Sequence, residues 1–311
     1  MRPTVAAGTV TQVRVEQVLE RLGGVASTGE LRRHVSWPRI RTARRRGGIV
    51  RDGWGRYAIA GADEDRRAAN RLTGVLCLQS AARQHGWKVK QQPAEPVIAV
   101  PRNRKLGPER RVGVRIVYVD LPAEHVDGIV TTPAYTVVHC AARLPFDEAL
   151  AIADSACRAG DVTAAQLIAL AEAMPLRYRG RCLRVAQEAD GRSANPFESV
   201  ARAVALDVPG LRIRPQVWIS NVGRADLGDK VLRLAVECES FEFHGKRAML
   251  KRDCERYNAF VEHGWLVVRF SYEHVMFEPD YVRRVLAAVV LVLGRGPLGR
   301  ALDQRAGDPA A

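Results

Sequence analysis

Three acidic residues, Asp226, Glu237 and Glu239, have the types and spacing that best suit chemistry in this chain. Residues 232–239 alternate between apolar and polar positions, which predicts a half-buried strand with Glu237 and Glu239 on one face. The turn-forming residues 228–230 precede it, so an antiparallel return places Asp226 alongside Glu237. Converging carboxylates repel one another unless a cation lies between them, and oxygen ligands of this kind suit Mg²⁺ or Mn²⁺. The alternative is a solvated strand face with an acidic run.

The charge of the chain points to a polyanionic partner. Its 311 residues allow two or three domains, and the formal net charge is +14 with a pI near 10.1. Such basicity favours nucleic acid, and a solubility role or an Arg-favouring genome is the alternative. Only 6% of the residues are aromatic, which gives no stacking platform typical of RNA recognition.

Cysteine usage and hydropathy indicate the compartment. The six cysteines form no CxxC pair and have no zinc spacing with histidine, which favours a reducing cytoplasm. Residues 1–10 lack the apolar stretch of a signal peptide, and the apolar run 285–293 is too short to cross a bilayer. We therefore expect a cytoplasmic protein with no membrane partner.

Residues 1–62 are predicted to form a winged helix-turn-helix that binds duplex DNA. An amphipathic helix ends at Gly23-Gly24, a second short helix begins at Ser27 or Thr28, and Trp37-Pro38 opens a third. A hairpin with its turn at Asp52-Gly53 follows over 49–59. The basic third helix suits the major groove, and a solvated basic helix in a protein-binding winged helix is the alternative. The expected DNA ligands are Arg39, Arg41, Arg44, Arg45 and Arg46, with Arg56 in the hairpin.

The rest of the chain divides into a mixed α/β middle region, a C-terminal α/β region and a tail, so the whole protein is α+β. The middle region, 63–190, is expected to contain helices over 68–85, 132–142, 146–159 and 163–173 and strands over 97–100 and 114–118. The region 191–295 reads αβββαβα, with strands over 213–219, 224–227, 232–239 and 265–270 and helices over 196–206, 246–263 and 279–293. The apolar strand 265–270 is expected to be central, and residues 296–311 to be a frayed tail.

The order and motifs of residues 193–290 resemble the PD-(D/E)xK nuclease superfamily, with a restriction-endonuclease-like αβββαβ fold. They look closer still to a family of uncharacterised domains related to very-short-patch-repair endonucleases. Several separate motifs in the expected order carry this resemblance: Glu198, Gln216, Arg224-Ala225-Asp226-Leu227, Val236-Glu237-Cys238-Glu239, Phe243-His244-Gly245, Asp253-x-x-Arg256-Tyr257-Asn258 and Gly264-Trp265-x-Val267-Val268-Arg269-Phe270.

This resemblance implies a metal-dependent nuclease site. Asp226 and Glu237 would hold Mg²⁺ or Mn²⁺, which would activate a water for attack on a phosphodiester. Glu198 would join through water, although a glutamate after an Asn195 cap also suits a helix start without catalysis. The usual Lys of the superfamily, two residues after the Glu, is Glu239 here. The remaining candidates are Gln216 and His244 to orient water or protonate the leaving group, and Glu239 as a further ligand.

The upstream regions resemble AbiEi-type antitoxin proteins, on residues 24–59, Ser80-Ala81-Ala82 and the helix beginning at Thr163. Two functions follow from the two resemblances. The first is a metal-dependent DNA endonuclease or nicking enzyme with a DNA-binding winged helix. The alternative is a non-catalytic transcriptional regulator, or a type IV toxin-antitoxin antitoxin with a cognate toxin as partner. The missing Lys favours the alternative, and the Asp226–Glu237 pair favours the enzyme. We expect Asp253 and Arg256 to form a helical ion pair.

Overall fold

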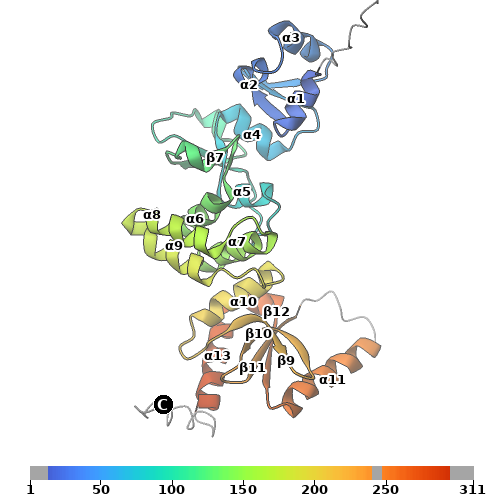
Figure 1. The fold of residues 1–311 in the computed structure, drawn as a ribbon, viewed down its shortest axis with the longest axis vertical. Coiled ribbons are helices and arrows are strands. Elements are labelled where there is room, and N and C mark those ends of the chain that lie inside the picture. Colours follow the sequence, from blue (N-terminus) through green and yellow to red (C-terminus); the bar gives the residue numbers. More distant parts are fainter. Residues whose placement is uncertain (1–12, 240–246, 295–311) are drawn as a thin grey trace, which may run out of the picture. The chain divides into compact units, whose positions relative to one another are not determined.

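A computed structural model of the chain describes residues 13–239 and 247–294 (Figure 1). Its helices α1–α13 and three sheets, one antiparallel and two mixed, confirm the predicted α+β class. The chain divides into two units, 1–81 with 93–132 and 82–92 with 133–311. This division falls inside the predicted middle region, and the predicted boundaries at 62/63 and 190/191 stay predictions.

A winged helix begins the first unit. Its elements are α1 (Val15–Arg21), β1 (Val25–Ser27), α2 (Thr28–Arg32), α3 (Trp37–Arg45), β2 (Val50–Gly53) and β3 (Arg56–Ala58). Leu19, Leu31 and Ile40 join the three helices through a fully buried core. Ser27 caps α2 in a reciprocal capping box with Glu30, which fixes where that helix begins.

Two details of the winged helix differ from the sequence prediction. The strand β1 was not expected, and it pairs with β3 as the third strand of the sheet. The hairpin turn lies at Trp54-Gly55, where Gly55 has φ 66°, and Asp52-Gly53 is part of β2. Asp52 accepts a 2.7 Å hydrogen bond from Arg67, so its carboxylate serves an ion pair and not a turn.

A mixed sheet follows in the first unit, with strand order β6-β5-β4-β8-β7. Its strands are β4 (Val75–Leu76), β5 (Val97–Val100), β6 (Arg115–Tyr118), β7 (Val126–Asp127) and β8 (Val130–Thr131), with short 3₁₀ turns at Pro108–Arg111 and Ala123–His125. The helix predicted over 68–85 is instead α4 (Glu64–Leu72), β4 and α5 (Leu78–Gln84). Thr73 ends α4 with φ 52°, and Gly74 lies so close to Ile98 that a Cβ there would meet it at 2.4 Å.

Four helices form the first part of the second unit: α6 (Pro133–Arg143), α7 (Phe146–Ala159), α8 (Ala164–Ala173) and α9 (Leu176–Glu188). The first three lie within about one residue of their predicted ranges. Thr163 caps α8 in a capping box with Gln166, which confirms that helix start. The helix α9, rich in arginine, was not predicted.

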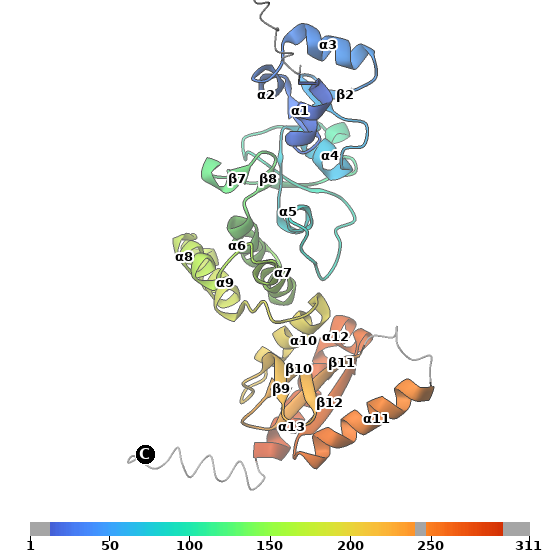
Figure 2. The same cartoon turned by 45° about the vertical axis from the view of Figure 1, so that its right-hand side comes forward.

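A four-stranded sheet forms the remainder of the second unit, with strand order β12-β11-β10-β9 (Figure 1 and Figure 2). Its elements are α10 (Pro196–Leu206), β9 (Arg214–Ile219), β10 (Gly223–Asp229), β11 (Leu234–Glu239), α11 (Arg247–Glu262), β12 (Leu266–Ser271), α12 (Tyr272–Phe277) and α13 (Pro279–Gly294). One face of the sheet packs against α10, α12 and α13, and the other packs against α11. Leu234 and Val236 enter the first core and Ala235 the second, as strand alternation predicts.

Two expectations for this sheet were wrong. Strand β12 lies at an edge and not in the centre, with β11 as its strand neighbour among the described residues. On α11, the sequence periodicity predicts a buried stripe of Leu250, Cys254, Tyr257 and Val261. Tyr257 packs against the second core, but Cys254 is exposed, Val261 is 65% exposed, and the fully buried residue is Phe260. The helix α13 contains the apolar run 285–293, and no described helix meets the length and hydropathy needed to cross a membrane.

His139 is buried in α6 without a hydrogen bond to either ring nitrogen from any described residue. Its ring centroid lies 5.5 Å from that of Tyr135. Burial, with a smaller contribution from Arg143, lowers the pKa of His139 from 6.5 to about 4. Between these two pKa values, His139 is therefore neutral in the folded protein and protonated in the unfolded chain.

This burial predicts acid destabilisation. A depressed pKa means that stability is fully present above about 6.5 and is lost as the pH falls toward 4. The loss at the lower end is roughly 3 kcal/mol, from the size of the displacement. We expect His139→Leu to become more stable relative to wild type as the pH falls through this window, measured by urea unfolding. A difference between the two proteins that does not change with pH would contradict a neutral buried His139.

Candidate functional site

The acidic residues predicted from the sequence lie at one level of the C-terminal sheet. Ala225 pairs with Val217 and Leu227 with Pro215, so Asp226 of β10 lies level with Gln216 of β9. Leu227 pairs with Val236, which puts Glu237 of β11 at the same level. Glu237 in turn pairs with Arg269 of β12. The structure therefore brings together residues from four strands that lie far apart in the sequence.

Glu198, at the start of α10, reaches the same level from the helical face. Gln216 Nε2 donates a 2.6 Å hydrogen bond to Glu198, which also accepts from the backbone N–H of Ala194 at 2.8 Å and from Asn195 Nδ2 at 3.0 Å. Gln216 has φ 54°, a left-handed conformation that a non-glycine residue adopts only at a cost. Burial raises the pKa of Glu198, and the nearby charge of Asp226 adds to the effect.

Asp226 is held by the neighbouring strand. Its Oδ2 accepts a 2.9 Å hydrogen bond from the backbone N–H of Cys238 in β11. Burial raises the pKa of Asp226, while this hydrogen bond and the charge of Arg256 oppose the rise.

Glu237 is paired with an arginine from α11. Arg256 Nη1 donates to Glu237 Oε2 at 2.9 Å and Nη2 donates to Oε1 at 3.0 Å, so the guanidinium binds both carboxylate oxygens. Glu237 is 4% exposed. Burial and the charge of Asp226 raise the pKa of Glu237 to about 7, and Arg256 opposes this.

Glu239, one step further along β11, is also paired within the protein. Arg269 Nε donates to Glu239 Oε1 at 3.1 Å, and the hydroxyl of Tyr257 donates to the same oxygen. The Arg269 guanidinium lies 4.0 Å from the centroid of the Tyr257 ring. Burial and the contact with Glu239 raise the pKa of Tyr257. His244, the remaining candidate from the sequence, lies outside the described residues.

The donor set as placed does not fit a divalent cation. Both oxygens of Glu237 accept from Arg256, and one oxygen of Asp226 accepts from an amide. Over residues 13–239 and 247–294, no three His, Cys, Asp or Glu side chains form a group that could hold a metal ion. The Mg²⁺ or Mn²⁺ expected at Asp226 and Glu237 stays a prediction.

Arg256 is the site residue that sequence reasoning missed. The i,i+3 spacing predicts its ion pair with Asp253, yet the structure directs it across to the sheet. The signal was present in its spacing from Phe260, since residues four apart share a helix face, and Phe260 is fully buried against that sheet. The rotation of α11 about its axis directs Arg256 toward Glu237 and not toward Asp253.

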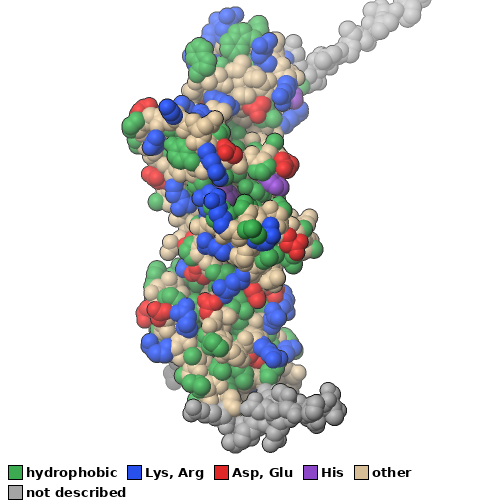
Figure 3. All heavy atoms as spheres, turned by 90° about the vertical axis from the view of Figure 1, so that its left-hand side faces the viewer, with side chains coloured by type: hydrophobic (Ala, Val, Ile, Leu, Met, Phe, Trp, Pro, Cys, Tyr) green, Lys and Arg blue, Asp and Glu red, His purple; other side chains and the backbone are tan. Residues whose placement is uncertain are grey.

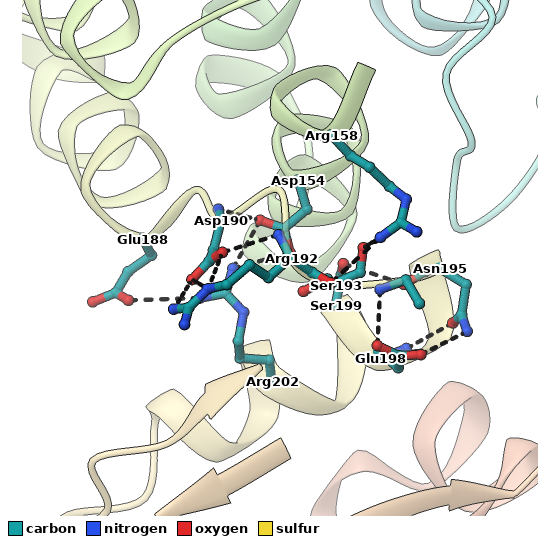
Figure 4. A network of polar contacts seen from close by, with 11 residues as sticks. Asp154, Arg158, Glu188, Asp190, Arg192, Ser193, Asn195, Glu198, Ser199 and Arg202 are labelled. Atoms are coloured by element: carbon teal, nitrogen blue, oxygen red, sulfur yellow. Dashed lines mark hydrogen bonds and ion pairs between the residues drawn. The ribbon is translucent and has the colours of Figure 1, made fainter. Parts of the chain in front are cut away.

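A buried ion-pair network positions α10 and thereby Glu198 (Figure 4). Arg202 of α10 is fully buried, and its Nη2 donates to both oxygens of Asp154 in α7 at 2.8 and 2.9 Å. Asp154 also accepts from the backbone N–H of Asp190 at 2.8 Å. Arg158 donates to the carbonyl of Ser193 at 2.9 Å, which ties α7 to the segment that enters α10.

A second candidate surface lies on the winged helix of the first unit. Four of the predicted DNA ligands are exposed on α3 or at its C-terminal end: Arg41, Arg44 and Arg45 in the helix and Arg46 directly after it. Arg39 is half-buried and donates to the carbonyl of Val13, so it ties α3 to the segment before α1. Ile40 and Ala43 form the buried face of the same helix. At the top of Figure 3, where Figure 1 places the winged helix, basic side chains surround exposed apolar ones.

A hollow of about 560 Å³ separates α3 from the hairpin. Arg44, Arg51 and Arg56 line it together with Trp37 and Trp54. Trp54 is 92% exposed at the hairpin turn, and the Arg51 guanidinium lies 5.0 Å from the centroid of its ring. The hollow is therefore basic and aromatic on both sides.

Comparison with known families agrees with one of the two resemblances. The family model of the AbiEi antitoxin C-terminal domain matches residues 74–185. This match confirms the antitoxin-like character of the region, and no match supports a nuclease domain.

Two curated relatives come from two strains of Mycobacterium tuberculosis. The uncharacterized proteins MT2308 and Rv2248 are each 31% identical to this chain over 252 residues, which cover 75% of this chain and 89% of each relative. Among solved structures, the crystal structure of the RV2827C protein from the same organism is 20% identical and covers 62% of this chain and 79% of that one. Its TM-score is 0.31, too low to establish a shared fold.

The Arg202–Asp154 pair carries a prediction about stability. Asp154→Asn leaves the buried guanidinium of Arg202 with only the more distant carboxylate of Glu188, at 3.8 Å, as a counter-charge. We expect this to cost about 3–5 kcal/mol, measured by urea unfolding. Asp154→Leu with Arg202→Met removes both charges and should recover most of this loss, because an apolar pair needs no compensation. A double variant as unstable as Asp154→Asn alone would show that packing, and not charge, holds the two helices.

Proposed function

We propose that this chain, which belongs to one family with the mycobacterial proteins MT2308 and Rv2248, is a DNA-binding regulator of the antitoxin type. The winged helix would bind duplex DNA, and the region similar to the AbiEi antitoxin C-terminal domain would act with a cognate toxin. The observation that carries this proposal is the row of exposed arginines on α3.

These arginines are available to phosphate. Within residues 13–239 and 247–294, no carboxylate pairs with Arg41, Arg44, Arg45 or Arg46, and α3 contains no acidic residue. Because each unpaired guanidinium on a phosphate displaces condensed counterions, several on one helix supply affinity that depends strongly on salt. The wide hollow beside α3, with Arg51 and Arg56 on the hairpin, suits the sugar-phosphate strand that flanks a groove.

The α3 surface predicts a salt-dependent loss of DNA binding. Replacing Arg41, Arg44 and Arg45 with Ala should weaken duplex binding and flatten the log–log salt slope by about one unit per lost phosphate contact. Fluorescence anisotropy of the full chain on duplex DNA over a range of salt concentrations measures both quantities. The matched control replaces Lys251, Arg252 and Arg284, which lie exposed in the other unit, and it should keep the wild-type slope. An unchanged slope in the α3 variant would remove this helix from the interface.

Toxin control is the second part of the proposal. If residues 74–185 act with a toxin while α3 reads DNA, then the α3 variant should still rescue cells from the cognate toxin. The same variant should no longer repress a reporter gene placed downstream of the DNA site that the winged helix is proposed to bind. Growth and reporter output in one strain separate the two effects. Rescue that disappears together with repression would contradict a division of labour between the two regions.

Endonuclease activity of residues 191–295 remains the second candidate. The observation in its favour is the convergence of Glu198, Gln216, Asp226 and Glu237 at one level of the sheet. Against it stands the pairing of those acids with groups of the protein, together with Glu239 at the position of the usual Lys. A plasmid nicking assay with Mg²⁺ or Mn²⁺ tests it, and the antitoxin-type function predicts no nicking.

A further inference from the structure

We propose that the guanidinium of Arg256 occupies the position in which the nuclease resemblance expects a divalent cation. The C-terminal sheet would then neutralise its own row of buried and half-buried carboxylates and would not depend on a metal ion. This inference concerns the second unit alone and does not depend on DNA binding by the winged helix.

The contacts of Glu237 are those that a cation would make. Its two oxygens are both bound by Arg256, at 2.9 and 3.0 Å, and the carboxylate is buried. A charge-assisted bidentate pair occupies a lone pair on each carboxylate oxygen and places a positive charge against the group, which repels a second cation. A hard cation needs those same oxygens at about 2.0–2.6 Å, so it cannot bind Glu237 in this way until the guanidinium leaves.

Arg256 also acts on Asp226, the other expected ligand. The Nη2 of Arg256 reaches the carbonyl of Arg224 on β10, the strand of Asp226, and Asp226 lies level with Glu237, so the guanidinium lies close to both carboxylates. One guanidinium thus offsets two neighbouring carboxylates that would otherwise repel across the two strands. This is the electrostatic task that a shared metal ion performs in a site of this kind.

The position of Arg256 is fixed by more than its charge. Its Nη2 also donates to the carbonyl of Arg224 at 2.8 Å, and its guanidinium lies 5.5 Å from the centroid of the Phe260 ring. Phe260 is fully buried, so the segment of α11 that carries Arg256 is anchored to the sheet. A side chain held at three points is part of the folded site and not a passing surface contact.

The next carboxylate along β11 follows the same arrangement. Glu239 takes the place of the usual Lys, and its charge is offset by Arg269 from β12 with the Tyr257 hydroxyl. The strand β11 has no basic residue beside these acids, and the positive charges come from Arg256 on α11 and Arg269 on β12. Each acid of β11 has its own arginine.

The experiment compares wild type, Arg256→Met and the double variant Glu237→Gln/Arg256→Met, each as the full chain. Hydrogen exchange of residues 234–239 reports on the sheet, and thermal unfolding reports on the protein, with EDTA or with millimolar MnCl₂. Arg252→Met is the matched control, because Arg252 is exposed on the same helix. A plasmid nicking assay runs in parallel.

We expect wild type and Arg252→Met to show the same exchange and melting temperature with and without Mn²⁺. Arg256→Met should melt roughly 5–10 °C lower in EDTA, because it leaves buried carboxylates uncompensated. Mn²⁺ should restore protection of residues 234–239 in this variant, since the vacated oxygens become ligands. The double variant should recover stability in EDTA and lose the response to Mn²⁺.

Three outcomes would overturn the proposal. The first is wild-type protein that Mn²⁺ stabilises, or that nicks DNA in an Asp226-dependent manner, since the metal would then enter beside Arg256. The second is a folded Arg256→Met variant that is not destabilised or does not respond to Mn²⁺. If Arg256→Met does not fold, the double variant decides, and a double variant that also fails to fold shows a packing role instead. Failure of DNA binding by α3 would leave these results unchanged.

Discussion

Buried charge must be compensated inside the protein, and the second unit is built around this constraint. Arg202 has no access to solvent, so Asp154 must lie against it, and this fixes α10 on α7. With α10 in place, Glu198 accepts a hydrogen bond from Gln216 in strand β9. Buried Glu237 on β11 likewise needs a counter-charge, and Arg256 of α11 supplies it. Both sites use an arginine from a helix and a carboxylate from a neighbouring element.

Arginine has different roles in the winged helix and in the second unit. The winged helix exposes arginines on α3, a helix without acidic residues, whereas in the second unit Arg202, Arg256 and Arg269 pair with acids. The basic residues of this chain, whose excess gives the net charge of +14, are thus used in two ways: unpaired on the surface of the winged helix and paired with acids within the second unit.

Local signals in the sequence predicted where several helices begin, whereas features that depend on contacts between distant segments were not predicted. Asn195-Pro196 and Thr163 placed two helix starts, because caps act within one turn. The predicted helix over 68–85 failed because β4 gains two strand partners that no local propensity reveals. The site acids were found through strand alternation, while the pairing of Arg256 depends on how α11 is rotated about its axis. That rotation is set by Phe260, which a periodicity centred on Cys254 and Val261 did not identify.

The position of strand β12 at an edge of the sheet bears on aggregation between copies of the protein. Among the described residues it is an edge strand that pairs with β11 alone, and Leu266, Val267 and Val268 give it an apolar run. Such an edge can template pairing with a second chain unless a charge interrupts it. Arg269 supplies that charge, and its bond to Glu239 keeps it in place. The residue that offsets a carboxylate in the site therefore also guards the sheet against edge-to-edge aggregation.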